Sequence, residues 1–138
     1  MTAASVGGKV IHTTADVDSI IVDGLATRSS LIESKRTALV KFIQVWFEIM
    51  DAIEANPDLV FATVDKELNL PSGAFKQDYQ GLKKGDQAMN QRMLIDGRLN
   101  DVAQQTYQLL SEDPRHGRII RNDVEINGDL FSQALQNP

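Results

Sequence analysis

One stretch of this chain, residues 36–56 (RTALVKFIQVWFEIMDAIEAN), limits its possible folds more than any other. At 100° per residue, its apolar residues form a core-facing stripe with the i, i+3, i+4, i+7 spacing of a buried helix, made of Leu39, Phe42, Ile43, Trp46, Met50 and Ile53. Further apolar residues flank this stripe on the same helix, namely Val40, Val45, Phe47 and Ile49. A helix that is apolar on so many sides must be covered from two directions, so we expect it to be the central helix of the fold.

The composition is that of an ordinary acidic globular chain. With 138 residues, 42% hydrophobic and 24% charged, it is long enough for one domain with a core. A net charge of −5 argues against a nucleic-acid partner, because neutralising phosphates requires a concentrated basic surface. The absence of cysteine excludes disulfides, thiolate catalysis and cysteine-bound metals. We find neither an apolar run long enough to span a membrane nor the apolar segment of a signal peptide.

Two short segments before the central helix are predicted to be strands. The first is Lys9–His12, and the second is Ser19–Arg28, which opens with β-branched residues and has Gly24 at a bend. Residues 13–18 form a polar loop between them. A sheet of two strands is only marginally stable, and an open strand edge tends to pair with another chain. We therefore expect a homodimer or a strand-swapped assembly.

The remainder of the chain predicts helices joined by short turns. Asn56 can cap a second helix and Pro57 suits its first turn. That helix would run to Leu68 and place four residues inward, Val60, Phe61, Val64 and Leu68. Further helices are expected at residues 72–80, at 87–95, from Leu99 to near Asp113-Pro114, and at 129–136. The residues alone thus predict a mostly helical chain with a short N-terminal strand pair.

Residue patterns for chemistry are weak throughout the chain. Glu48, Asp51 and Glu54 have helical spacing, and we expect them on a solvated helix edge rather than in acid–base catalysis. The two histidines, His12 and His116, have no metal-ligand spacing. We therefore predict no metal, no cofactor and no enzymatic activity. A basic patch in a loop could bind an anion or a partner, or be simply solvated; it comprises Arg115, His116, Arg118 and Arg121.

The order of elements resembles the C-terminal part of solute-binding proteins of ABC transporters. The resemblance is to the nitrate, sulfonate, taurine and bicarbonate group, with its thiamine-pyrimidine relatives. It rests on Lys9-Val10-Ile11 with the strand after it, and on the Trp46-Phe47 helix that runs into Ala55-Asn56-Pro57-Asp58. The later order adds Leu70-Pro71 with Phe75, the Gly81-Leu82 turn and the Asp129-Leu130-Phe131 helix. Lys83-Lys84 departs from the more apolar pattern of these relatives.

The resemblance implies a fold and a function. The fold would be α/β, the C-terminal part of a type II periplasmic-binding-protein fold. Residues 1–28 would supply the end of a second lobe and the hinge strands, and residues 29–138 the helical C-terminal part of the first lobe. The parent protein would be periplasmic or extracytoplasmic. It would capture a small anionic or zwitterionic solute by lobe closure and deliver it to the membrane permease of the transporter.

Three aspartates are the predicted ligand-binding residues. Asp16 and Asp18 precede the predicted hinge strand, and Asp23 lies on it. A carboxylate there could pair with a ligand amine or hold a hinge hydrogen bond. The competing interpretation is a solvated loop with a charge at a strand edge.

Other functions remain open at this point. One is a sensory ligand-binding lobe of a fused signalling protein. Another is a helical module that dimerises without a small ligand. An enzyme of the thiamine-pyrimidine type would need His and Cys groups, and this stretch has no Cys.

Overall fold

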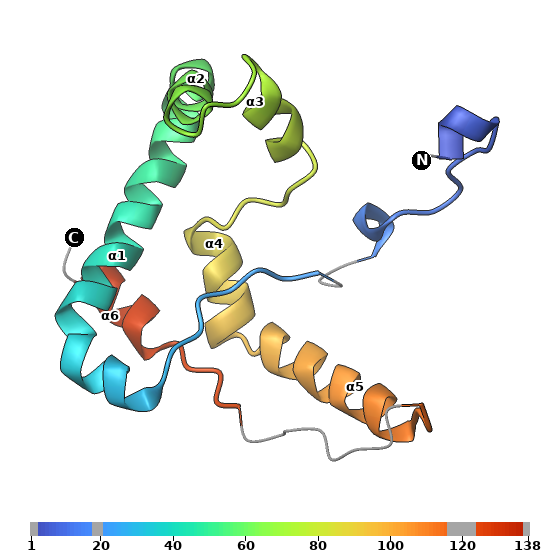
Figure 1. Ribbon diagram of the computed structural model, residues 1–138. Helices are drawn as coiled ribbons and strands as arrows, with labels where there is room; N and C mark the ends of the chain where they lie inside the picture. Colours follow the sequence, from blue (N-terminus) through green and yellow to red (C-terminus); the bar gives the residue numbers. More distant parts are fainter. Residues whose placement is uncertain (1–2, 18–20, 116–123, 137–138) are drawn as a thin grey trace.

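Figure 1 shows a helical chain with one long helix along one edge of the molecule. The computed structural model describes residues 3–17, 21–115 and 124–136. In chain order the elements are η1 (Ala3–Val6), η2 (Thr14–Asp16), α1 (Ser29–Ala55), α2 (Pro57–Glu67), α3 (Ala74–Tyr79), α4 (Gln87–Asn90), η3 (Gln91–Ile95), α5 (Arg98–Glu112) and α6 (Asp129–Gln136). The first two are short 3-10 helices, and η3 is a π-helical turn that continues α4.

The predicted α/β fold with an N-terminal strand pair is wrong. Among the described residues there is no strand: Lys9–His12 is irregular, and residues 22–28 have no regular secondary structure. Ser19 and Ile20 lie outside the described residues. β-branched residues favour a strand only where a neighbouring strand supplies hydrogen bonds and burial, whereas Ile11 is 95% exposed. The mostly helical part of the prediction is confirmed.

The central helix α1 begins at Ser29, earlier than its apolar core, and bends near its start. Lys35 leaves helical geometry, with φ −124° and ψ 17°. The hydroxyl of Ser34, the residue directly before Lys35, donates to the carbonyl oxygen of Ser30 in the preceding turn at 2.8 Å. Serine bonds of this kind to the preceding turn bend helices. The apolar stretch predicted from the sequence is therefore the long second piece of α1, from Arg36 onward.

The corner between α1 and α2 forms as its local sequence predicts. Asn56 accepts the Leu59 backbone N–H at 3.3 Å, and Pro57 occupies the first turn of α2. Phe61 is buried, as predicted. Leu68 lies just past the end of α2 and is exposed, so its inward placement was wrong.

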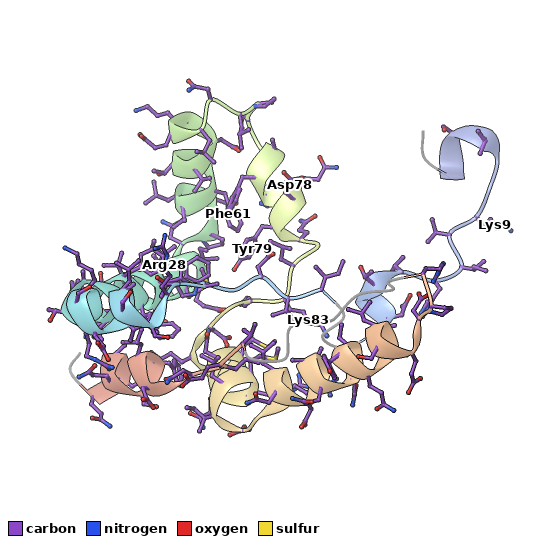
Figure 2. The ribbon with its side chains drawn as sticks, turned by 60° about the horizontal axis from the view of Figure 1, so that its bottom comes forward. Lys9, Arg28, Phe61, Asp78, Tyr79 and Lys83 are labelled. Atoms are coloured by element: carbon purple, nitrogen blue, oxygen red, sulfur yellow. The ribbon has the colours of Figure 1, made fainter. Side chains whose placement is uncertain are left out.

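An aromatic cluster closes the C-terminal end of α1 against α2 and α3. Phe61 is its centre, with ring centroids 5.7 Å from Phe75 and 5.1 Å from Tyr79. Met50 and Ile53 contribute the buried side chains of α1 to the same cluster. Figure 2 shows Phe61 and Tyr79 facing each other between the two short helices. The two aromatic residues of α3, four apart in sequence, are thus both used for packing.

Helix α6 covers one side of α1, as both views show (Figures 1 and 2). Phe131 of α6 packs edge-on against Phe47, with centroids 5.8 Å apart. The Gln44 side-chain amide donates to the Ala134 carbonyl oxygen at 3.3 Å. The covered side of α1 is therefore the Phe47 side.

This packing corrects the predicted core stripe. Met50 and Ile53 are buried as expected, but Phe42 and Trp46 are exposed. Phe47, predicted only as a flanking residue, is buried instead. Periodicity identified an apolar helix correctly, but it does not state from which side another element will approach.

Candidate functional site

The segment between α3 and α4, residues 81–86, lies against α1. The Trp46 indole Nε1 donates to the Gly85 carbonyl oxygen at 2.7 Å. A Cβ on Gly85 would sit 3.3 Å from Cζ2 of the indole, so glycine allows this close approach. Lys84 adds an ion pair with Glu54 of α1. Trp46 therefore holds a loop in place instead of filling a core.

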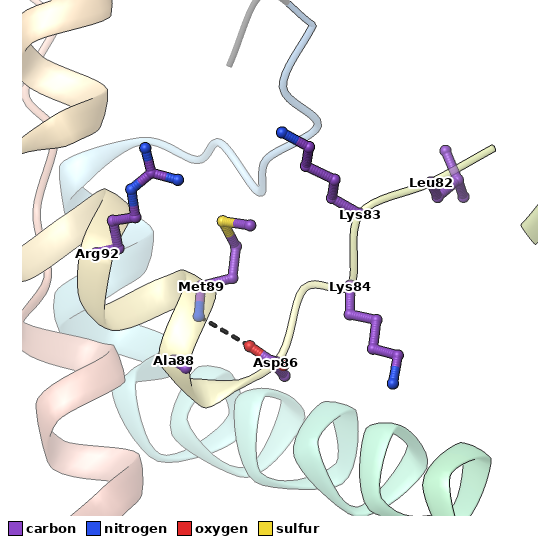
Figure 3. Close-up of a pocket in the computed structure, with 7 residues that line it drawn as sticks. All are labelled: Leu82, Lys83, Lys84, Asp86, Ala88, Met89 and Arg92. Carbon is purple, nitrogen blue, oxygen red and sulfur yellow. Dashed lines mark hydrogen bonds between the residues drawn. The ribbon is translucent and has the colours of Figure 1, made fainter. Parts of the chain in front are cut away.

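Beside this loop lies an open hollow with a volume of about 540 Å³. Its lining residues, drawn in Figure 3, are Leu82, Lys83, Lys84, Asp86, Ala88, Met89 and Arg92. We call it the 82–92 hollow. Its volume lies within the range of about 300–1,000 Å³ that is usual for small-molecule sites.

The charges of the 82–92 hollow favour an anion. Figure 3 shows the Lys83 and Arg92 side chains on either side of Met89, while Lys84 points away from them. The carboxylate of Asp86 caps α4, accepting the Met89 backbone N–H at 2.8 Å. Of the three cationic side chains that line the hollow, Lys84 is paired with Glu54, and the one lining carboxylate, Asp86, is engaged in capping. Such a cluster attracts anions even in a chain of net charge −5.

The predicted ligand-binding aspartates do not line this hollow. Asp16 ends η2, where it accepts the Thr13 backbone N–H at 2.7 Å and lies 3.3 Å from Nδ1 of His12. Asp23 is exposed within the irregular segment 22–28, and Asp18 lies outside the described residues. Within the described residues, Asp16 pairs with His12 and not with Asp23. Their role in binding a ligand stays a prediction.

Other residues singled out in the sequence have plain structural roles. Glu48 and Glu54 are exposed, as predicted, and pair with Lys41 and Lys84. Arg115, the described member of the basic patch, pairs with Asp113 at 2.6 Å. Within the described residues, no group of three or more His, Cys, Asp or Glu side chains is placed to hold a metal ion.

The sequence analysis missed the 82–92 hollow because its cations come from separate elements. Lys83-Lys84 was noted only as a departure from the family pattern. Arg92 follows in η3 after the α4 turn, which Asp86 caps, and it lines the hollow across Met89 from Lys83 (Figure 3). The sequence did contain a useful signal. The pair Lys83-Lys84 is followed by Asp86, which can cap a helix. Met89 and Arg92 come next, three residues apart and so on one helix face.

Comparison with known proteins assigns no family. No family model, no curated protein and no solved structure matches this chain. Among the described helices, none is both long and apolar enough to cross a membrane. The resemblance to solute-binding proteins therefore stays a prediction, and the function must be argued from the surface of the molecule.

Proposed function

We propose that this chain captures a small anionic solute in the 82–92 hollow, as the ligand-binding part of a receptor that serves an ABC transporter. The observation in support is the placement of Lys83 and Arg92 beside Met89 (Figure 3). An ammonium and a guanidinium group offer an anion charge-assisted hydrogen bonds, which are stronger than neutral ones. The resemblance described above suggests the kind of protein, and the hollow suggests the chemistry of the solute.

The hollow is open, and this has a consequence for the proposal. Small-molecule sites bury most of the surface of their ligand, so a second surface must close over an anion bound here. In a receptor that works by closure, that surface belongs to another lobe. On this proposal the parent protein is extracytoplasmic and hands the solute to a membrane permease.

The test is a thermal-shift screen of the chain with nitrate, sulfonates, bicarbonate, amino acids and pyrimidines. A solute that binds only the folded state raises the melting temperature by mass action. We expect a saturable rise with one class of anion and none with neutral pyrimidines.

Two variants connect that shift to the hollow. Lys83→Gln and Arg92→Gln should each reduce it, because each removes one cation from the binding surface. Lys66→Gln is the matched control, since Lys66 is an exposed lysine of α2 outside the hollow. A folded chain that shows no shift with any anion, or an equal loss in the Lys66→Gln control, would contradict the proposal.

A further inference from the structure

Helix α1 has a second apolar side that α6 does not cover. Phe47 lies on the covered side of α1. At 100° per residue, Phe42, Val45 and Ile49 are rotated from it by about 140–200° around the helix axis, so they lie on the opposite side. These three side chains are 54%, 39% and 43% exposed, respectively. Exposed Ala38 and Ala52 extend the same line by about one turn at each end. We call this line of five residues the outer face.

The outer face is almost palindromic in sequence. Ala38 and Ala52 lie seven residues before and after Val45, and Phe42 and Ile49 lie three before and four after it. A twofold axis through Val45 would therefore place apolar residues opposite apolar residues along its whole length. Isologous twofold interfaces require this kind of self-complementarity. The small alanines at both ends allow two helix backbones to approach closely.

Charged residues along one edge of the outer face follow the same symmetry. Lys41 lies four residues before Val45 and Glu48 three residues after it, on the same side of the helix. Within one chain the two side chains form an ion pair of 3.7 Å. In an antiparallel pair of helices, Lys41 of each copy faces Glu48 of the other. In a parallel pair, the same edge of the two copies lies on opposite sides of the interface, so Lys41 and Glu48 would not meet across it.

The molecule also exposes more surface than a folded monomer of its mass. Its accessible surface is 10994 Å² at 15.3 kDa, whereas the usual scaling gives about 7,100 Å². The excess is several times the roughly 800 Å² per partner that a stable interface buries. Surface is therefore available for a dimer, and the outer face is an apolar part of it that lies on the longest helix, α1.

We propose that a second copy of this chain covers the outer face, through antiparallel pairing of two α1 helices about a twofold axis near Val45. The dimer expected from the sequence used the open edge of a strand pair, which the described residues do not form. In the proposed dimer, the outer face of α1 replaces the strand edge as the contact between the two copies. This pairing is independent of solute binding, since neither Lys83 nor Arg92 belongs to the outer face.

Size-exclusion chromatography with light scattering tests the dimer on the whole chain. We expect a mass of twice 15.3 kDa that falls toward 15.3 kDa on dilution. Ile49→Lys should give the monomer mass at every concentration, because it places a charge in the apolar interface. Leu109→Lys is the matched control, because Leu109 is an exposed leucine on α5. A wild-type monomer at all concentrations would overturn the proposal, as would equal loss of the dimer in the control.

Cysteine crosslinking tests the antiparallel register, and the natural chain has no cysteine to interfere. A mixture of Ala38→Cys and Ala52→Cys chains should form a disulfide-linked dimer on oxidation. Ala38→Cys alone should not, because two copies of this residue would lie about 21 Å apart in the antiparallel pair, far beyond disulfide reach. Crosslinking of Ala38→Cys alone, or none in the mixture, would overturn the register.

Discussion

At the scale of single residues, a buried aspartate explains the turn between α2 and α3. Asp65 is 5% exposed, and both of its carboxylate oxygens accept backbone N–H groups. Oδ2 accepts from Gly73 at 2.6 Å and Oδ1 from Phe75 at 2.9 Å. The first N–H groups of a helix have no partner within the helix, so Asp65 supplies from α2 what α3 lacks. Gly73 itself adopts φ 83°, which favours glycine.

Replacing Asp65 should therefore release α3. Asp65→Ala leaves two backbone N–H groups without acceptors and should reduce the free energy of unfolding by about 1–3 kcal/mol. Asp65→Asn keeps one acceptor oxygen and should cost less. Urea denaturation of both variants gives the comparison. Equal stability of wild type and Asp65→Ala would contradict this role.

A surface ion pair makes a second residue-scale prediction, about pH. The Lys76 ammonium lies 2.8 Å from the Asp58 carboxylate, and this hydrogen bond and charge hold the pKa of Asp58 below its ordinary value of 3.8. A lowered carboxyl pKa contributes stability above the pKa of the unfolded chain, and that contribution is lost as the pH falls through the lower folded pKa. The pair is exposed, so its contribution is small.

Lys76→Gln should return the pKa of Asp58 toward its ordinary value, because it removes the charge that stabilises the carboxylate. An NMR titration of the side-chain carboxyl carbon of Asp58 measures this change directly. Lys66→Gln, on α2 but not paired with Asp58, is the control and should leave that titration unchanged. An unchanged Asp58 titration in Lys76→Gln would show that the ion pair does not form in solution.

At the scale of elements, an aromatic contact lies at the centre of the docking of α6 on α1. Phe131 is 2% exposed and packs on Phe47. Among the described residues it is also the most buried hydrophobic residue of the core. The aromatic cluster of α2 and α3 lies at the C-terminal end of α1 and does not include α6. The two contacts are therefore separate, and losing one should leave the other.

Phe131→Ala should detach α6 while α2 and α3 stay packed. Replacement of a buried phenylalanine by alanine costs about 3–5 kcal/mol, which is enough to free a helix of eight residues. Hydrogen exchange should show lost protection in α6 alone. Leu135→Ala, at an exposed position of the same helix, should have little effect. Uniform loss of protection over the whole chain would mean that the molecule unfolds as one unit.

At the scale of the whole molecule, the helices were predictable and their packing was not. The helices predicted at residues 57–68, 72–80 and 129–136 correspond closely to α2, α3 and α6. These limits follow from apolar spacing, from Asn56 as a cap and from glycine and proline breaks, all of which act within a few residues. The π-helical turn after α4 was not predicted, since nothing in its spacing distinguishes it from an α-helix.

The strands show why local preference was insufficient. Val10, Ile11 and Ile21 have strand-forming side chains, yet a strand is stable only when a neighbouring strand pairs with it. The 82–92 hollow shows the same limit for a site. Lys83 and Arg92 were visible in the sequence, but their approach depends on the cap at Asp86 and on the position of η3 (Figure 3).

The sequence by itself determined that residues 36–56 are helical with apolar residues on several sides, because periodicity and capping act through near neighbours. Only the tertiary structure decided that α6 covers the Phe47 side and that Trp46 holds the loop at Gly85. The side that a helix buries depends on contacts between residues about ninety positions apart, such as Gln44 and Ala134. Helical spacing contains no information about such distant partners.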